Sequence, residues 1–228
     1  MKKKSLPKRS SSVALTHSQM SFFWVLLILS FLALLLYRVL FTFPVWVDEV
    51  IMKLFVFGLP FILFARSVKK SPEFFGLGLR RFWPGAFYGL AMGGIFGFVA
   101  LITSAVQRGH AFIPYVFAST SFWYQFGLAF VTAWWESLFF YGLIMSVLYV
   151  YYKKDEMKAS LMTTGLFLLF HAPILFIRVG FLASLFPLAL LAFFAFGQAV
   201  MYLRCKALTS VVVSHAFWGM ALLVYTMR

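Results

Sequence analysis

The chain has 228 residues, of which 63% are hydrophobic and only 11% are charged. Soluble domains are about half apolar, so this composition excludes an ordinary water-soluble globular protein. The formal net charge of +14 could indicate nucleic acid as a partner, but the basic residues are scattered through short gaps between apolar runs and form no single basic face, so we expect no nucleic-acid partner.

The N-terminal residues 1–20 are polar and carry five lysines and arginines among serines. The first apolar run follows at about 21–43. It is longer than the apolar core of a signal peptide and lacks a small-residue cleavage site, so we interpret it as a retained membrane span. Residues 1–20 are therefore predicted to be a basic cytoplasmic tail.

Six further apolar runs follow, and together with the first they predict an all-α, polytopic transmembrane helical bundle of about seven spans. A bilayer core about 30 Å thick needs about 20 apolar residues per helix. Residues 21–228 are expected to form this single bundle. The second run is short, and its Lys53 is expected to reach the membrane interface. The six runs lie at about 50–65, 82–106, 122–151, 159–177, 181–203 and 207–227.

The distribution of lysine and arginine predicts the orientation of these spans. The N-terminal tail and every second gap hold fifteen of the twenty basic residues. By the positive-inside rule, the N-terminus lies in the cytoplasm and the C-terminus outside. We expect a multi-pass protein of a bacterial cytoplasmic membrane.

Three glycines of the third run, Gly89, Gly93 and Gly97, recur at every fourth residue. This spacing places them on one helical face and lets a neighbouring helix approach closely. We interpret the pattern as a packing surface, not as a binding site.

Glu136 lies in the middle of the fourth run, whereas the other five acidic residues lie in gaps or at predicted interfaces. Lys153 lies about 25 Å further along the helix, so the Glu136 side chain cannot extend to the headgroups at that end. Burying such an acid costs about 3 kcal/mol. We therefore expect Glu136 to have a functional role that offsets the cost of its burial.

Two histidines repeat this pattern, because His171 and His215 lie inside the fifth and seventh runs. A buried glutamate can be a protonated structural acid, and a histidine in a span can be an interhelical hydrogen-bonding residue. Because acids and histidines inside membranes mark proton relays, ion paths and catalytic sites, we favour a shared site formed by all three residues.

The residues around these three side chains resemble motifs of the CAAX protease and bacteriocin-processing family, also called CPBP or Abi intramembrane proteases. That family shows E-E-x-x-x-R, often followed by Gly, then F-x-x-x-H, then H-x-x-x-N. The similar segments here are 136–142 (ESLFFYG), 167–171 (FLLFH) and 215–219 (HAFWG). The resemblance covers the C-terminal half and implies a CPBP-like core at about 122–227.

The resemblance implies that Glu136 and His171 activate a water for peptide hydrolysis and that His215 stabilises the oxyanion. It also implies supporting roles for the motif positions Phe167, Ser137, Tyr141 and Gly219. The last three depart from the family pattern, in which these positions are Glu, Arg and Asn. Loss of the Asn removes an oxyanion donor, which typically costs about 10² to 10³ in rate, unless Ser214, Tyr141 or a water substitutes for it.

The leading hypothesis is an intramembrane endopeptidase of the glutamic type that acts on a membrane-tethered or lipidated substrate among membrane lipids. A catalytically inactive relative acting as an immunity or scaffold protein is the alternative, and a proton-coupled transporter a weaker one, because no repeated halves are visible. If a metal is bound, the ligands are Glu136, His171 and His215. A divalent ion such as zinc would suit them, but the sequence requires none.

Overall fold

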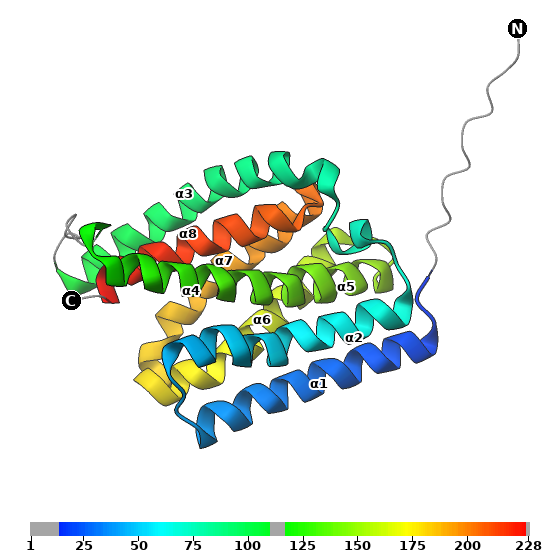
Figure 1. Cartoon of the computed structure of the whole chain (residues 1–228), viewed down its shortest axis with the longest axis horizontal. Coiled ribbons are helices and arrows are strands. Elements are labelled where there is room, and N and C mark those ends of the chain that lie inside the picture. Colours follow the sequence, from blue (N-terminus) through cyan, green and yellow to red (C-terminus); the bar gives the residue numbers. More distant parts are fainter. Residues whose placement is uncertain (1–13, 110–116, 227–228) are drawn as a thin grey trace, which may run out of the picture.

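The computed structural model describes residues 14–109 and 117–226. Most of the predicted basic tail, residues 1–13, lies outside the described residues, as does Arg228. All predicted spans fall within the described part apart from their outermost residues (Figure 1).

Each apolar run predicted to span the membrane is helical. In two of the runs, π-helical segments join the α-helices. The elements in chain order are α1 (His17–Leu40), the π-helices η1 (Val47–Met52) and η2 (Leu54–Gly58), α2 (Leu59–Val68), the 3-10 helices η3 (Pro72–Phe75) and η4 (Leu79–Arg81), α3 (Phe82–Arg108), α4 (Thr120–Ser137), the π-helix η6 (Leu138–Met145), α5 (Ser146–Tyr151), α6 (Glu156–Val179), α7 (Phe181–Cys205) and α8 (Leu208–Thr226).

Five of these helical segments are long and apolar enough to cross a membrane by length and composition. The chain therefore forms the predicted all-α membrane bundle. Helix α8 contains a shorter apolar stretch, and the run from η1 to α2 is helical but interrupted by π-helical turns. The five segments are His17–Leu40, Pro72–Gln107, Thr120–Tyr151, Glu156–Val179 and Phe181–Cys205.

Local capping explains where the helices begin. Thr16 and Gln19 form a reciprocal capping box, so α1 begins four residues earlier than the apolar run at Ser21 indicated. Asp155 caps α6 by accepting a hydrogen bond from the Lys158 backbone N–H. Gly180, at a φ of 81°, separates α6 from α7.

The helices pack roughly along a common direction. α1 and α2 lie side by side at one edge, and α3 and α8 pack together at the other (Figure 1). The continuous helix of α4, η6 and α5 runs between these two pairs and contacts α8, α6 and the π-helical segments of the second run. This central helix carries Glu136, so the candidate site lies inside the bundle.

The predicted glycine packing surface of α3 is confirmed for two of its three members. A Cβ on Gly89 would overlap the carbonyl oxygen of Ser210, and one on Gly93 would lie 3.0 Å from the Cα of Ser214. A Cβ on Gly97 would make only ordinary contacts, at 3.6 Å or more. The close contact fixes the backbone of α8 immediately before His215.

Aromatic side chains fill the bundle around the central helix. The ring of Phe140 lies 4.7 Å from that of Phe167 and 5.4 Å from that of Phe170. Phe57 brings the second run into the same cluster, at 5.1 Å from Phe139. These contacts hold η2, η6 and α6 together directly beside the candidate site.

Candidate active site

Glu136 lies in the last turn of α4, directly before the π-helical segment η6, and its exposed fraction is 3%. π-helical turns are uncommon and occur frequently at functional sites. Every residue of η6 is buried, so the peptide segment that follows Glu136 is fixed by packing on all sides.

His171 on α6 approaches Glu136 from one side, with 3.6 Å between its Nε2 and Oε2 of the glutamate. Its Nδ1 lies 2.7 Å from the carbonyl oxygen of Phe167, and the two rings stack at 4.2 Å. Because a carbonyl oxygen only accepts, Nδ1 is the donor. In the neutral ring, Nε2 therefore carries a lone pair toward the carboxylate.

His215 on α8 approaches the same carboxylate oxygen from a second side, at 3.7 Å between its Nε2 and Oε2 of Glu136. Its Nδ1 lies 3.4 Å from Oγ of Ser137. The ring also packs edge-on against Phe194 of α7, at 5.2 Å. Helices α4, α6 and α8 thus bring the three ionisable residues singled out in the sequence to one point.

The remaining motif positions lie at different distances from this point. Ser137 faces His215, and Phe167 supports His171. The hydroxyl of Tyr141, in contrast, donates to the carbonyl oxygen of Ala195 at 3.3 Å, so the structure directs it toward α7. Gly219 lies one helical turn after His215 and faces Ala129 of α4.

Ser214, the other residue considered as a substitute oxyanion donor, is fully buried. Its Oγ accepts a hydrogen bond of 2.6 Å from Nε2 of Gln198. The two side chains join α8 to α7 behind His215. Ser214 therefore contributes to the support of the histidine helix.

Lys53 is the main feature of the site that the sequence did not reveal. It was expected to reach the membrane interface, but this expectation is wrong: the residue is only 8% exposed, and its Nζ contacts Oε1 of Glu136. Glu136 is therefore not the lone interior charge. The available signal was the place of Lys53 within an apolar run, four residues after Glu49.

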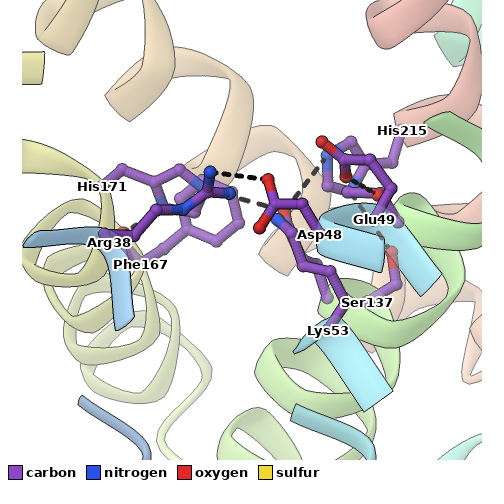
Figure 2. Close-up of polar contacts among 10 residues, drawn as sticks. Arg38, Asp48, Glu49, Lys53, Ser137, Phe167, His171 and His215 are labelled. Atoms are coloured by element: carbon purple, nitrogen blue, oxygen red, sulfur yellow. Dashed lines mark hydrogen bonds and ion pairs between the residues drawn. The ribbon is translucent and has the colours of Figure 1, made fainter. Parts of the chain in front are cut away.

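Two further polar contacts surround this ion pair. Oε2 of Glu49 accepts a hydrogen bond from Oγ1 of Thr132, and Nη1 of Arg38 lies 2.6 Å from Oδ2 of Asp48 (Figure 2). The sequence placed Asp48 and Glu49 in gaps or at interfaces, and the structure shows both partly buried at the start of the second helical run. The π-helix η1 carries both residues and is followed directly by Lys53.

The donor set does not fit a resident metal ion. No group of three or more His, Cys, Asp and Glu side chains within residues 14–109 and 117–226 has the arrangement of a metal site. The ammonium of Lys53 already occupies one oxygen of Glu136, and a divalent ion on the same carboxylate would lie close to that positive charge.

A cavity of about 70 Å³ lies beside the site, between α1, η2 and α6. A cavity of this size holds a few water molecules and is smaller than a typical ligand pocket. Its polar wall is formed by Arg38, Lys53 and His171, whose side chain is 25% exposed. The apolar wall includes Leu34, Phe57, Phe170, Ile174 and Ile177.

Comparison with known protein families gives a match over residues 117–221 to the model described as "Rce1-like: Type II CAAX prenyl endopeptidase Rce1-like". Comparison with the curated proteins and with the solved structures finds no match. The family is one of proteases, and the matched segment contains Glu136, His171 and His215. Residues 117–221 of this chain are therefore similar to the Rce1-like family of CAAX proteases.

Proposed function

We propose that this protein is an intramembrane endopeptidase of the glutamic type that hydrolyses a peptide bond in a membrane-tethered or lipidated substrate. One observation carries the proposal. Oε2 of the buried Glu136 lies 3.6 and 3.7 Å from the Nε2 atoms of His171 and His215. These separations exceed a direct hydrogen bond, and a single water beside the groups can lie within hydrogen-bond distance of Oε2 and of an imidazole.

In the proposed reaction, the substrate water donates to Oε2 of Glu136 and to Nε2 of His171. Glu136 takes one proton as the water oxygen attacks the peptide carbonyl carbon. The same proton then passes to the amide nitrogen as the C–N bond breaks, which yields a carboxylic acid and an amine and restores the carboxylate. His171 orients the water through the lone pair that its bond to Phe167 leaves on Nε2.

His215 stabilises the oxyanion of the tetrahedral intermediate in this mechanism. If Ser137 donates its hydroxyl proton to Nδ1, the proton of the neutral ring stays on Nε2 and faces the reacting atoms. A hydrogen bond aimed at the developing negative charge lowers the barrier because it is already oriented before the reaction. Ser137 is thus a positioning residue for His215.

The cavity beside His171 supports a substrate that arrives from the bilayer. Its wall is mostly aliphatic and aromatic, and it opens between α1 and α6. A peptide held at the membrane by an apolar anchor could bring its scissile bond to Glu136 without leaving the hydrocarbon region. A free hydrophilic peptide would have to be desolvated first, at a large cost in free energy.

The Glu136→Gln variant tests the catalytic role of the carboxylate. Glutamine has nearly the same shape but cannot accept the proton of the water, so processing of a co-expressed membrane-tethered substrate should fall at least about 10³-fold. Intact-mass analysis of the substrate measures the reaction. Glu156→Gln, at the exposed start of α6, is the matched control and should process normally. Processing by Glu136→Gln at the wild-type rate would disprove the assignment.

The departures at Ser137, Tyr141 and Gly219 favour a second candidate, a non-catalytic immunity or scaffold protein of the same family. In that case, the Glu136→Gln variant would retain its function in cells, and the purified wild-type protein would cleave no substrate. The two candidates are distinguished by comparing cellular function with cleavage by the purified protein in detergent or liposomes.

A further inference from the structure

We propose that Lys53 is the positioning residue of Glu136. It supplies, from the second helical run, the buried cation that orients the carboxylate toward the two histidines. The ion pair itself is observed in the structure, whereas its importance for catalysis rests on the proposed function. The contact between Nζ of Lys53 and Oε1 of Glu136 carries the inference.

The two oxygens of Glu136 have different partners. Oε1 contacts the ammonium of Lys53, and Oε2 faces the imidazoles of His171 and His215. A carboxylate held in this way cannot rotate about its terminal bond without breaking the ion pair. Lys53 therefore determines which oxygen meets the substrate water.

Charge and burial make this contact energetically important. The ionised forms of Glu136 and Lys53 are both excluded from water, and each would be costly to bury alone. The other ionisable groups that act on Glu136 are His171, His215, Tyr37 and Tyr141, none of which carries a permanent positive charge. Among the described residues around the carboxylate, the lysine brings the compensating charge.

The position of Lys53 is fixed by its own surroundings. Its Nζ lies 5.5 Å from the ring centroid of Phe57 one turn along the helix, a favourable cation–π distance. A Cβ on Gly58 would lie 2.8 Å from the ring of Trp135, so this glycine lets η2 approach the Glu136 helix closely. The short approach places the lysine head group at the carboxylate.

A second polar contact joins the same two helical segments. Glu49 and Lys53 are four residues apart, and so are their partners Thr132 and Glu136. The two contacts therefore lie one helical turn apart between the second helical run and α4. The contact between Glu49 and Thr132 does not involve Glu136, so its removal provides an internal control.

The family motif has a cation five residues after the first glutamate, and here that position is Tyr141. The hydroxyl of Tyr141 donates to Ala195 and is fully buried, so it offers no charge to Glu136. Lys53 therefore provides a positive charge that the local motif of this chain lacks, from a helix outside the matched segment 117–221.

A double-mutant cycle on thermal stability tests the ion pair without any substrate. Lys53→Met and Glu136→Gln should each lower the melting temperature in detergent, because each leaves the partner buried without its counter-charge. The double variant carries a neutral pair of similar size and should regain at least half of the loss. Lys158→Met, which removes an exposed partner of Asp155, is the control and should leave the melting temperature unchanged. Additive losses in the double variant would overturn the inference.

The positioning role is tested with the substrate that the wild type processes. Lys53→Met should lower kcat about 10- to 100-fold with little change in KM, because a misplaced carboxylate still permits substrate binding. Lys53→Arg, which keeps the charge, should recover most of the rate. Thr132→Val removes the hydrogen bond to Glu49 and should keep kcat within about 3-fold of the wild-type value. A Lys53→Met variant with wild-type kcat would refute the role.

The outcomes for the two proposals are separable. If the wild type cleaves no substrate but the stability cycle shows coupling, the ion pair stands and the protease proposal fails. If Glu136→Gln abolishes processing and Lys53→Met leaves both stability and kcat unchanged, the protease proposal stands and the role of Lys53 fails.

Discussion

At the residue scale, the proposed chemistry depends on a carboxylate whose two oxygens lie in different surroundings. One oxygen of Glu136 contacts an ammonium, and the other faces two imidazoles. The imidazoles are themselves oriented, His171 by the carbonyl of Phe167 and His215 by Ser137. In the proposed hydrolysis, such orientation before the substrate binds lowers the barrier.

Gly219 is the residue at which this constellation departs most from the family motif. A Cβ there would lie 3.6 Å from the Cβ of Ala129, an ordinary contact, so the backbone accepts a side chain. We expect Gly219→Asn to raise the kcat of the wild-type protein about 10-fold or more by adding an oxyanion donor one turn after His215.

Gly219→Ala is the matched control for that substitution, because it fills the same space without a donor and should leave kcat unchanged. Turnover of a purified substrate in detergent measures both variants. Equal rates for the Asn and Ala variants would show that no donor acts from this position.

At the scale of elements, π-helical turns lie on both sides of the ion pair. Lys53 separates η1 from η2, and Glu136 lies two residues before η6. A π-helical turn contains more residues than an α-helical one and shifts the side chains that follow it. Both helices thus depart from regular geometry at the residues that contact each other.

Helix α8 is positioned by its close contact with α3, and Gly89→Ala tests this contact. The added Cβ would overlap a backbone carbonyl of α8, so the two helices must separate, at a cost of about 1 to 3 kcal/mol. A lower melting temperature in detergent is the expected result.

Gly94→Ala on the same helix is the control, because a Cβ at Gly94 meets no atom within 4 Å. Alanine is also the better helix former, by about 1 kcal/mol, so this variant should be at least as stable as the wild type. If both alanine variants had the same melting temperature, the close contact between α3 and α8 would contribute nothing to stability.

At the scale of the whole molecule, the two ends of the bundle differ in charge. The connections between α2 and α3, between α5 and α6, and between α7 and α8, together with the adjoining helix ends, carry most of the described lysines and arginines and lie at one end (Figure 1). The turn between α1 and η1 and the turn at Gly180 lie at the other end, near Arg38 and Asp48. The positive-inside rule predicts that the basic end faces the cytoplasm.

Cysteine labelling tests this orientation. In a Cys205→Ser background, Lys154→Cys at the basic end should react with a membrane-impermeant maleimide only after the cells are permeabilised. Arg178→Cys at the opposite end should react in intact cells. Both residues are exposed, so accessibility reflects the side of the membrane. The reverse labelling pattern would contradict the predicted topology.

The sequence by itself determined the helical membrane bundle and the three helices that carry Glu136, His171 and His215. In a bilayer, an apolar run of about 20 residues folds as a spanning helix, and an ionisable residue within such a run is easily recognised in the sequence. The motifs at 136–142, 167–171 and 215–219 were also sufficient to indicate the protease family that the comparison of residues 117–221 supports.

Only the tertiary structure decided which side chains surround Glu136. Lys53 lies 83 residues away in the chain, and a lysine near the start of a short span has the flexible stem to reach either the interface or the interior. The packing of η1 and η2 against α4 selects the interior. Such a choice depends on contacts between helices, and the local sequence around Lys53 does not encode it.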